Sequence, residues 1–334
     1  MEEVATDSKQ VNIDPKTLLD LVLSGAKERR CGIYLHHLEG LDRHRIYQEL
    51  ETERLDDKFL RIQDLYARSQ SNWNQIFLIG LLNSISDMNN RENYQEVGHM
   101  VHFSIIQRER ASLRNIEALL IGASGLLDTL PQDSFTTEFR KSAEFMLYKY
   151  QITPIYSKMW NLKKITAVKH PIIRLSQIAR LLYENEFPFN HLVNFQNRND
   201  IISFFNVEAS MEWCLRVKGG AKSASHIGVS KCDLIGINFV VPMLYAYGLY
   251  TADDSITDRA GYINETLPAE SNFYITSWRK RGLTPQSAYE TQALIQLAKV
   301  YCDNHLCEKC HIYKHMLSPY SILPKLPIFV EHMR

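Results

Sequence analysis

Three cysteines close together late in the sequence are the residues best suited to chemistry. They are Cys302, Cys307 and Cys310, separated by four and then by two residues. Clustered thiols in a chain without a secretory pattern indicate a metal site or a redox function. Structural zinc takes four ligands, and a histidine can join three thiolates. His315, five residues after Cys310, is therefore the candidate fourth ligand of a zinc site.

An iron–sulfur cluster is the alternative occupant, because the same spacing occurs in plant-type ferredoxins. That reading needs a distant fourth cysteine, which only Cys31, Cys214 or Cys232 can supply. The sequence is equally compatible with no cofactor, the thiols then being reduced or forming a Cys307–Cys310 redox pair. We expect zinc ahead of iron–sulfur, with the site holding the C-terminal segment in place rather than catalysing a reaction.

The segment 216–231 is rich in glycine, serine and lysine, which is typical of an exposed loop. Lys218, Lys222 and Lys231 are candidate anion ligands, because ammonium groups and loop amides can bind phosphate together. The segment lacks the Gly-x4-Gly-Lys-Ser/Thr pattern of a P-loop, and no strand is expected before it. The sequence therefore favours a mobile surface loop over a phosphate site.

Glu96, His99 and His102 form one Glu-x-x-His and one His-x-x-His on an expected helix. A di-iron bundle needs two Glu-x-x-His motifs and further carboxylates. No second Glu-x-x-His lies on another long expected helix, so we expect partly buried, hydrogen-bonded histidines. Nucleophile-elbow, zinc-protease and dinucleotide-binding motifs are also missing from the sequence. The sequence identifies no catalytic residue and leans against an enzyme.

Helical periodicity recurs along the chain, with apolar residues three and four positions apart. A long amphipathic helix is expected at 42–69, with a charged face exposed to solvent, and an apolar, central helix at 73–88. A later helix begins after Thr284-Pro285 or at the capping pattern of Ser287 and Glu290. No alternating strand is apparent, so the fold class is all-α, a compact multi-helix array essentially without β-sheet.

The helical segments also indicate how the chain is organised. Residues 1–13 are expected to be a flexible tail, followed by helical subdomains at 14–150 and 151–334. The irregular, proline-containing stretch at 151–171 is the candidate boundary between them. Its aromatic residues indicate packing, so we expect the two subdomains to form one continuous unit.

The composition describes a soluble globular protein. Apolar residues make up 45% of the chain and charged residues 23%, and 38 basic residues balance 38 acidic ones. This balance gives no general attraction to nucleic acid, so any such binding is expected to be weak and sensitive to salt. No uninterrupted apolar run of about 18 residues is present, which predicts no membrane span. The polar start of the sequence predicts a cytoplasmic protein.

Several phrases in order resemble one protein family, the domain of unknown function 2851 of Bacteroidetes. They are NIEALLIGASGLL at 115–127, PIIRLSQIA at 171–179, VVPMLYAYG at 240–248, LPAESN at 267–272, SAYETQALIQL at 287–297 and the cysteines that follow. The resemblance covers residues 50–315 and implies a bacterial cytoplasmic protein. Longer relatives begin with a nuclease-like region, and this chain resembles their helical C-terminal part without it.

Two hypotheses for function follow. The first is a helical binding or scaffold module with a protein partner, associated with nucleic-acid processing. The alternative is an enzyme that uses the cysteine cluster or the loop at 216–231. A basic groove lined by Arg216, Lys218, Arg279 and Arg281 would favour nucleic acid. A deep pocket with convergent titratable groups would favour an enzyme.

Overall fold

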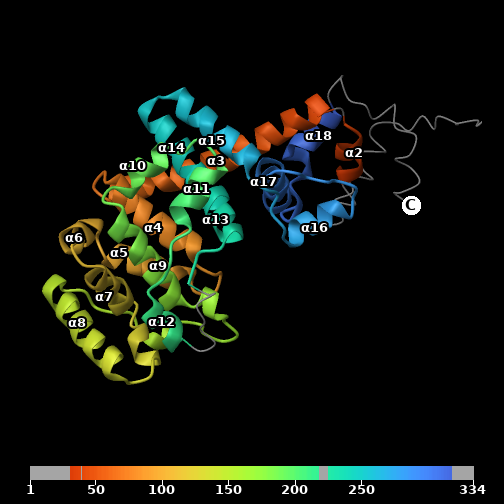
Figure 1. Cartoon of the computed structure of the whole chain (residues 1–334). Helices are drawn as coiled ribbons and strands as arrows, with labels where there is room; N and C mark the ends of the chain where they lie inside the picture. Colours follow the sequence, from red (N-terminus) through yellow and green to blue (C-terminus); the bar gives the residue numbers. More distant parts are fainter. Residues whose placement is uncertain (1–30, 39, 218–224, 318–334) are drawn as a thin grey trace, which may run out of the picture. The chain divides into compact units, whose positions relative to one another are not determined.

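The computed structural model describes residues 31–38, 40–217 and 225–317. These residues are mostly helical, and none of them forms a β-strand (Figure 1). Two isolated bridges, Glu208–His226 and Pro268–Ser287, are the only β-type pairings among them. The prediction of an all-α fold is therefore confirmed. The expected tail at 1–13 lies outside the described residues.

The helices form two compact units, one of residues up to Asp57 and from Glu265, the other of Lys58–Asn264. The first contains α2 (Cys31–His37), the start of α3 (Gly40–Arg68), the end of α15 (Asp254–Thr266), α16 (Phe273–Arg279), α17 (Ala288–Gln296), η7 (Leu297–Cys302), η8 (Cys307–Lys309) and α18 (His311–Met316). The second contains the rest of α3, then α4 (Trp73–Ile85), α5 (Arg91–Met100), α6 (Phe103–Glu109), α7 (Leu113–Ala123), η2 (Leu126–Thr129), α8 (Ser134–Tyr150), η3 (Ser157–Met159), η4 (Ala167–Lys169), α9 (Pro171–Glu184), α10 (Pro188–Val193), α11 (Arg198–Phe205), α12 (Met211–Arg216), α13 (Val229–Ile235), η6 (Gly236–Val240), α14 (Val241–Thr251) and most of α15.

The boundaries between the units fall within α3 and α15, whereas the sequence placed a boundary at 151–171. That stretch is attached to α7 and the turn after it. Ile155 donates its backbone N–H to the Ala123 carbonyl at 2.9 Å, and the Trp160 indole donates to the Ser124 carbonyl at 2.8 Å. Trp160 is buried, so this irregular segment belongs to the core of the second unit.

The first unit is built around Trp278, which is fully buried and donates its indole N–H to the Leu294 carbonyl at 3.0 Å. Apolar residues from α2, α3, α17, η7 and α18 surround it in one cluster. Ser287 begins α17, because its hydroxyl accepts the backbone N–H of Glu290. Of the two starts that the sequence allowed for this helix, the structure therefore has the one at Ser287.

Helix α4 occupies the core of the second unit, as its apolar sequence predicted. Asn72 caps it by accepting the backbone N–H groups of Asn74 and Gln75. Phe77 stacks on Phe205 and meets Phe239 edge to face in the core. Figure 1 shows α7 and α8 side by side, and α7 also packs against α9.

Helices α13, η6 and α14 run together as one helix, Val229–Thr251. It is long and apolar enough to cross a membrane by length and composition, although 72% of its most apolar window is buried inside the fold. Its middle part, Gly236–Val240, is π-helical. Pro242 follows this segment after one residue, Val241. Because proline cannot donate to the preceding turn, the wider π turn accommodates it.

His170 caps α9 in its neutral form, and this predicts a pH-dependent stability. Its Nδ1 accepts the Ile172 N–H, and burial lowers the pKa of His170 to about 4. Below pH 6.5 the unfolded chain binds a proton that the folded chain does not, so this contribution is lost as the pH falls from 6.5 towards 4. His170→Asn keeps a hydrogen-bond acceptor at the cap but cannot take up the proton. Between pH 7.5 and pH 5 we expect this variant to lose on the order of 1–2 kcal/mol less free energy of unfolding than the wild type. Urea unfolding of both proteins at pH 7.5 and pH 5 measures it; equal pH dependence would contradict the assignment.

Candidate functional site

A pocket of about 520 Å³ in the second unit collects positive charge. The segment of α3 from Lys58 on, α4, α5, η6 and α14 border it, and no aspartate or glutamate is among its lining residues. Its cationic and imidazole groups are Lys58, Arg61, Arg68, Arg91 and His99. The fold therefore concentrates positive charge here, although the chain as a whole is neutral.

Helical spacing explains how these groups meet. Lys58, Arg61, Ile62, Leu65 and Arg68 recur three or four positions apart, so they share one face of α3. Helix α5 presents a second stripe at four-residue intervals, formed by Arg91, Gln95 and His99.

The floor of the pocket is apolar. Ile76 and Ile79 of α4 form it together with Phe239, Pro242 and Met243. Gly80 permits this arrangement, because a Cβ at that position would lie 2.6 Å from the Phe239 ring. Three amide side chains complete the lining, those of Asn83, Gln95 and Asn238.

The charges at the rim are available to a ligand to different degrees. Arg61 and Arg91 are exposed and make no ion pair with any residue that the structure describes. Arg68 is paired with Asp64, one turn earlier on α3 and exposed to solvent. An exposed pair of this kind contributes little to stability, so an anionic ligand can replace Asp64 at low cost.

Further cations lie near Arg91. The Lys231 ammonium donates to the Ser84 carbonyl at 2.8 Å. Burial, together with the charges of Arg174, Lys169 and Arg91, lowers the pKa of Lys231 to about 8. Arg174 is itself buried, which lowers its pKa as well, and it donates to the Gln177 amide oxygen at 3.0 Å.

The predicted anion ligands of the loop are placed as follows. Lys231 lies on α13 and its ammonium is engaged, while Lys218 and Lys222 lie outside the described residues. Arg216, proposed for a basic groove, forms ion pairs with Asp133 and Glu212. Its charge is therefore compensated locally.

The expectation of partly buried histidines in α5 and after it is wrong. His99 and His102 are both exposed. His99 lines the basic pocket, because it is two turns after Arg91 on the same helix face. His102 lies at the cap of α6, where no hydrogen bond of its ring to the helix end is formed.

The cysteine cluster lies in the first unit. Cys302 ends η7 and is buried, Cys307 begins η8, and the Cys310 sulfur caps α18 by accepting the Tyr313 N–H at 3.3 Å. As the described side chains stand, no three metal-ligating groups are arranged to hold an ion. The metal site remains a prediction.

The candidate fourth ligand, His315, has other partners for both ring nitrogens. Its Nδ1 lies 2.7 Å from the Tyr34 hydroxyl, and its Nε2 lies 3.8 Å from the Asp42 carboxylate. These contacts connect α18 with α2 and α3.

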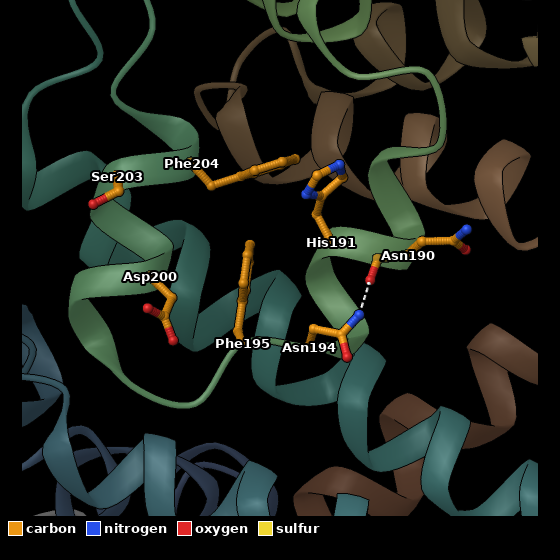
Figure 2. A pocket seen from close by; sticks show the side chains of 7 residues that line it. All are labelled: Asn190, His191, Asn194, Phe195, Asp200, Ser203 and Phe204. Atoms are coloured by element: carbon orange, nitrogen blue, oxygen red, sulfur yellow. Dashed lines mark hydrogen bonds between the residues drawn. The ribbon is translucent and has the colours of Figure 1, made fainter.

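Another pocket of the second unit, of about 540 Å³, is shown in Figure 2. In this view Phe195 lies between Asp200 and His191. The Asp200 carboxylate accepts the backbone N–H groups of Gln196 and Asn197 at the start of α11, and the His191 ring lies against Phe204. Because these polar groups already hold the local fold, this pocket is the weaker candidate.

The fold and the pocket define an all-α protein with a cation-lined cavity. A family model described as Protein of unknown function (DUF2851) matches residues 9–273, and the chain belongs to this family. The family named by the resemblance is confirmed, although the match begins and ends earlier than residues 50–315 and leaves the phrase at 287–297 outside it. No curated protein and no solved structure matches the chain. The match includes every lining residue of the basic pocket and ends before Cys302.

Proposed function

We propose that the second unit binds a single strand of nucleic acid through the basic pocket. The observation that carries this proposal is a lining with four basic side chains, one histidine and no carboxylate. Phosphates dominate the affinity of proteins for nucleic acids, and arginine binds phosphate oxygens with two parallel hydrogen bonds. Arg61 and Arg91 are free of carboxylate partners within the described chain, and they supply this interaction.

The floor of the pocket suits a nucleobase. Cavities of a few hundred Å³ with apolar walls and a few amides are typical of small-ligand sites, and about 520 Å³ accommodates one nucleotide. The base lies against Phe239 and Met243 in our proposal. Asn83, Gln95 and Asn238 offer donors and acceptors for the base edge.

The chemistry of the pocket supports a binding role more than catalysis. Nucleophilic serine and cysteine side chains and carboxylates are not among its lining residues. Acid–base catalysis there would rest on His99 and Lys58, since arginine does not lose its proton in proteins. We therefore favour a binding module. We further propose that it acts in the cytoplasm with a nucleic-acid-processing protein as its partner.

Charge reversal in the pocket tests the proposal. We expect Arg61→Glu and Arg91→Glu each to weaken binding of a fluorescein-labelled single strand by about tenfold or more, because a charge-assisted hydrogen bond contributes about 1.5–3 kcal/mol. Fluorescence anisotropy titrations at low salt provide the dissociation constants.

The matched control is Lys141→Glu, a charge reversal at an exposed site on α8 that does not line the pocket. Its affinity is expected to stay within about threefold of the wild type, since a distant surface charge is screened. Equal losses in all three variants would show nonspecific attraction instead. A free nucleotide that binds as tightly as the strand would assign the pocket to a small ligand.

A further inference from the structure

A fourth cysteine lies beside the C-terminal cluster in the first unit. Cys31 is the first residue of α2, and its thiol is hydrogen-bonded to the thiol of Cys302. Cys302 and Cys310 belong to one buried cluster, and Cys31 packs against that cluster. Cys307 is three residues before Cys310, and its charge interacts with those of Cys31 and Cys310. The fold thus brings together four of the six cysteines of the chain.

Neighbouring contacts hold Cys31 at this place. The Tyr34 hydroxyl, one turn later on α2, lies 2.7 Å from His315 Nδ1 on α18. Gly32 lies close to α16, where a Cβ would be 3.2 Å from the Trp278 ring. Both contacts fix the start of α2 against the elements that carry or surround the other three cysteines.

The imidazoles near the cluster are already engaged. His311 lies 2.8 Å from the Glu49 carboxylate through Nδ1 and 3.2 Å from that of Glu53 through Nε2. His315 faces Tyr34 and Asp42. A ligand set of four thiols therefore requires no existing histidine contact to break, whereas a set with His315 does.

We propose that Cys31, Cys302, Cys307 and Cys310 form a four-thiolate site for a thiophilic metal, either one zinc ion or an iron–sulfur cluster. Both occupants are held by four cysteine sulfurs. Binding replaces the thiol protons by metal–sulfur bonds, and rotation of the cysteine side chains brings the sulfurs to one centre. The site ties α2 to the end of η7 and to the start of α18, residues that are about 270 positions apart.

The neighbouring thiols of the cluster influence one another. Burial and the charges of Cys302 and Cys307 together raise the pKa of Cys310 to about 11, and burial and the charge of Cys302 raise that of Cys307. Zinc and iron bind cysteine as the thiolate, so binding releases the thiol protons to solvent.

The test is elemental analysis of the tag-free full chain, purified without oxygen and reconstituted with zinc or with iron and sulfide. We expect about one equivalent of zinc, or iron and sulfide with a visible absorption band that bleaches on reduction. In native alkylation with mass spectrometry, the four cysteines are expected to be protected together and to react together after metal removal. The metal content distinguishes a zinc ion from an iron–sulfur cluster, and finding either one would support the site.

Two variants decide the ligand set. Cys31→Ser is expected to lose at least about half of the bound metal, because a four-thiolate site then lacks one ligand. Cys232→Ala, at a buried cysteine of the second unit, is the control and keeps the metal content. Less than a tenth of an equivalent of either metal in the wild type, unchanged metal in Cys31→Ser, or a Cys31–Cys302 disulfide in the anaerobic protein would each overturn the proposal. Strand binding by the second unit is independent of these outcomes.

Discussion

Replacing Gly125 by alanine is expected to destabilise the second unit by at least about 3 kcal/mol. Gly125 has a φ of +67°, a left-handed conformation that costs a residue with a side chain about 1–2 kcal/mol. An added Cβ would lie 1.8 Å from the Ile155 carbonyl oxygen, so the backbone of the segment after α8 must also move. Urea unfolding followed by far-UV circular dichroism measures the change.

Gly261→Ala is the matched control for this substitution. Gly261 lies inside α15, and nothing is within 4 Å of a Cβ built there. Alanine is expected to be neutral or to stabilise the helix by up to about 1 kcal/mol, because its helix propensity is higher. If Gly125→Ala proved as stable as the wild type, the turn between α7 and η2 would not have the described geometry.

Truncation of Trp278 is expected to be the most damaging change in the first unit. Trp278→Ala removes a fully buried side chain and its hydrogen bond to Leu294, for a loss of about 3–5 kcal/mol. Trp278→Phe keeps much of the packing and loses the hydrogen bond, so its cost is expected near 1–2 kcal/mol. Hydrogen exchange with mass spectrometry locates the effect.

The described division of the chain predicts where protection is lost. Peptides from α16 and α17 are expected to exchange faster in Trp278→Ala, while peptides from α4 and α7 keep their protection, because the two groups belong to different compact units. Equal acceleration everywhere would mean that the chain unfolds as one cooperative body, contrary to this expectation.

Local signals for helix starts are present in the sequence. Asn72 and Ser287 have the side-chain oxygens that cap helices, and Pro171 occupies the first position of α9, where its missing N–H is not needed. These features act within a few residues, so they can be read before the fold is known. The division into two units cannot be read from the sequence in this way, because α3 is one continuous amphipathic helix across the boundary at Asp57.

The basic pocket escaped sequence reasoning for a similar reason. Arg61 and Arg68 lie among acidic residues on α3, a pattern typical of a solvent-exposed face. Only packing of α3 and α5 beside η6 places them with Arg91 around one cavity. Cys31 was one of three thiols that could complete an iron–sulfur set, and no local pattern distinguishes it from Cys214 and Cys232.

The salt dependence of single-strand binding tests the central proposal most directly. For the wild type we expect the association constant to fall steeply with salt, because bound arginines release counterions from the strand. The double variant Arg61→Gln/Arg91→Gln removes two phosphate contacts without adding a repulsive charge. Its log–log slope is expected to be smaller in magnitude by about 1.4. An unchanged slope in the double variant would contradict a nucleic-acid site in this pocket.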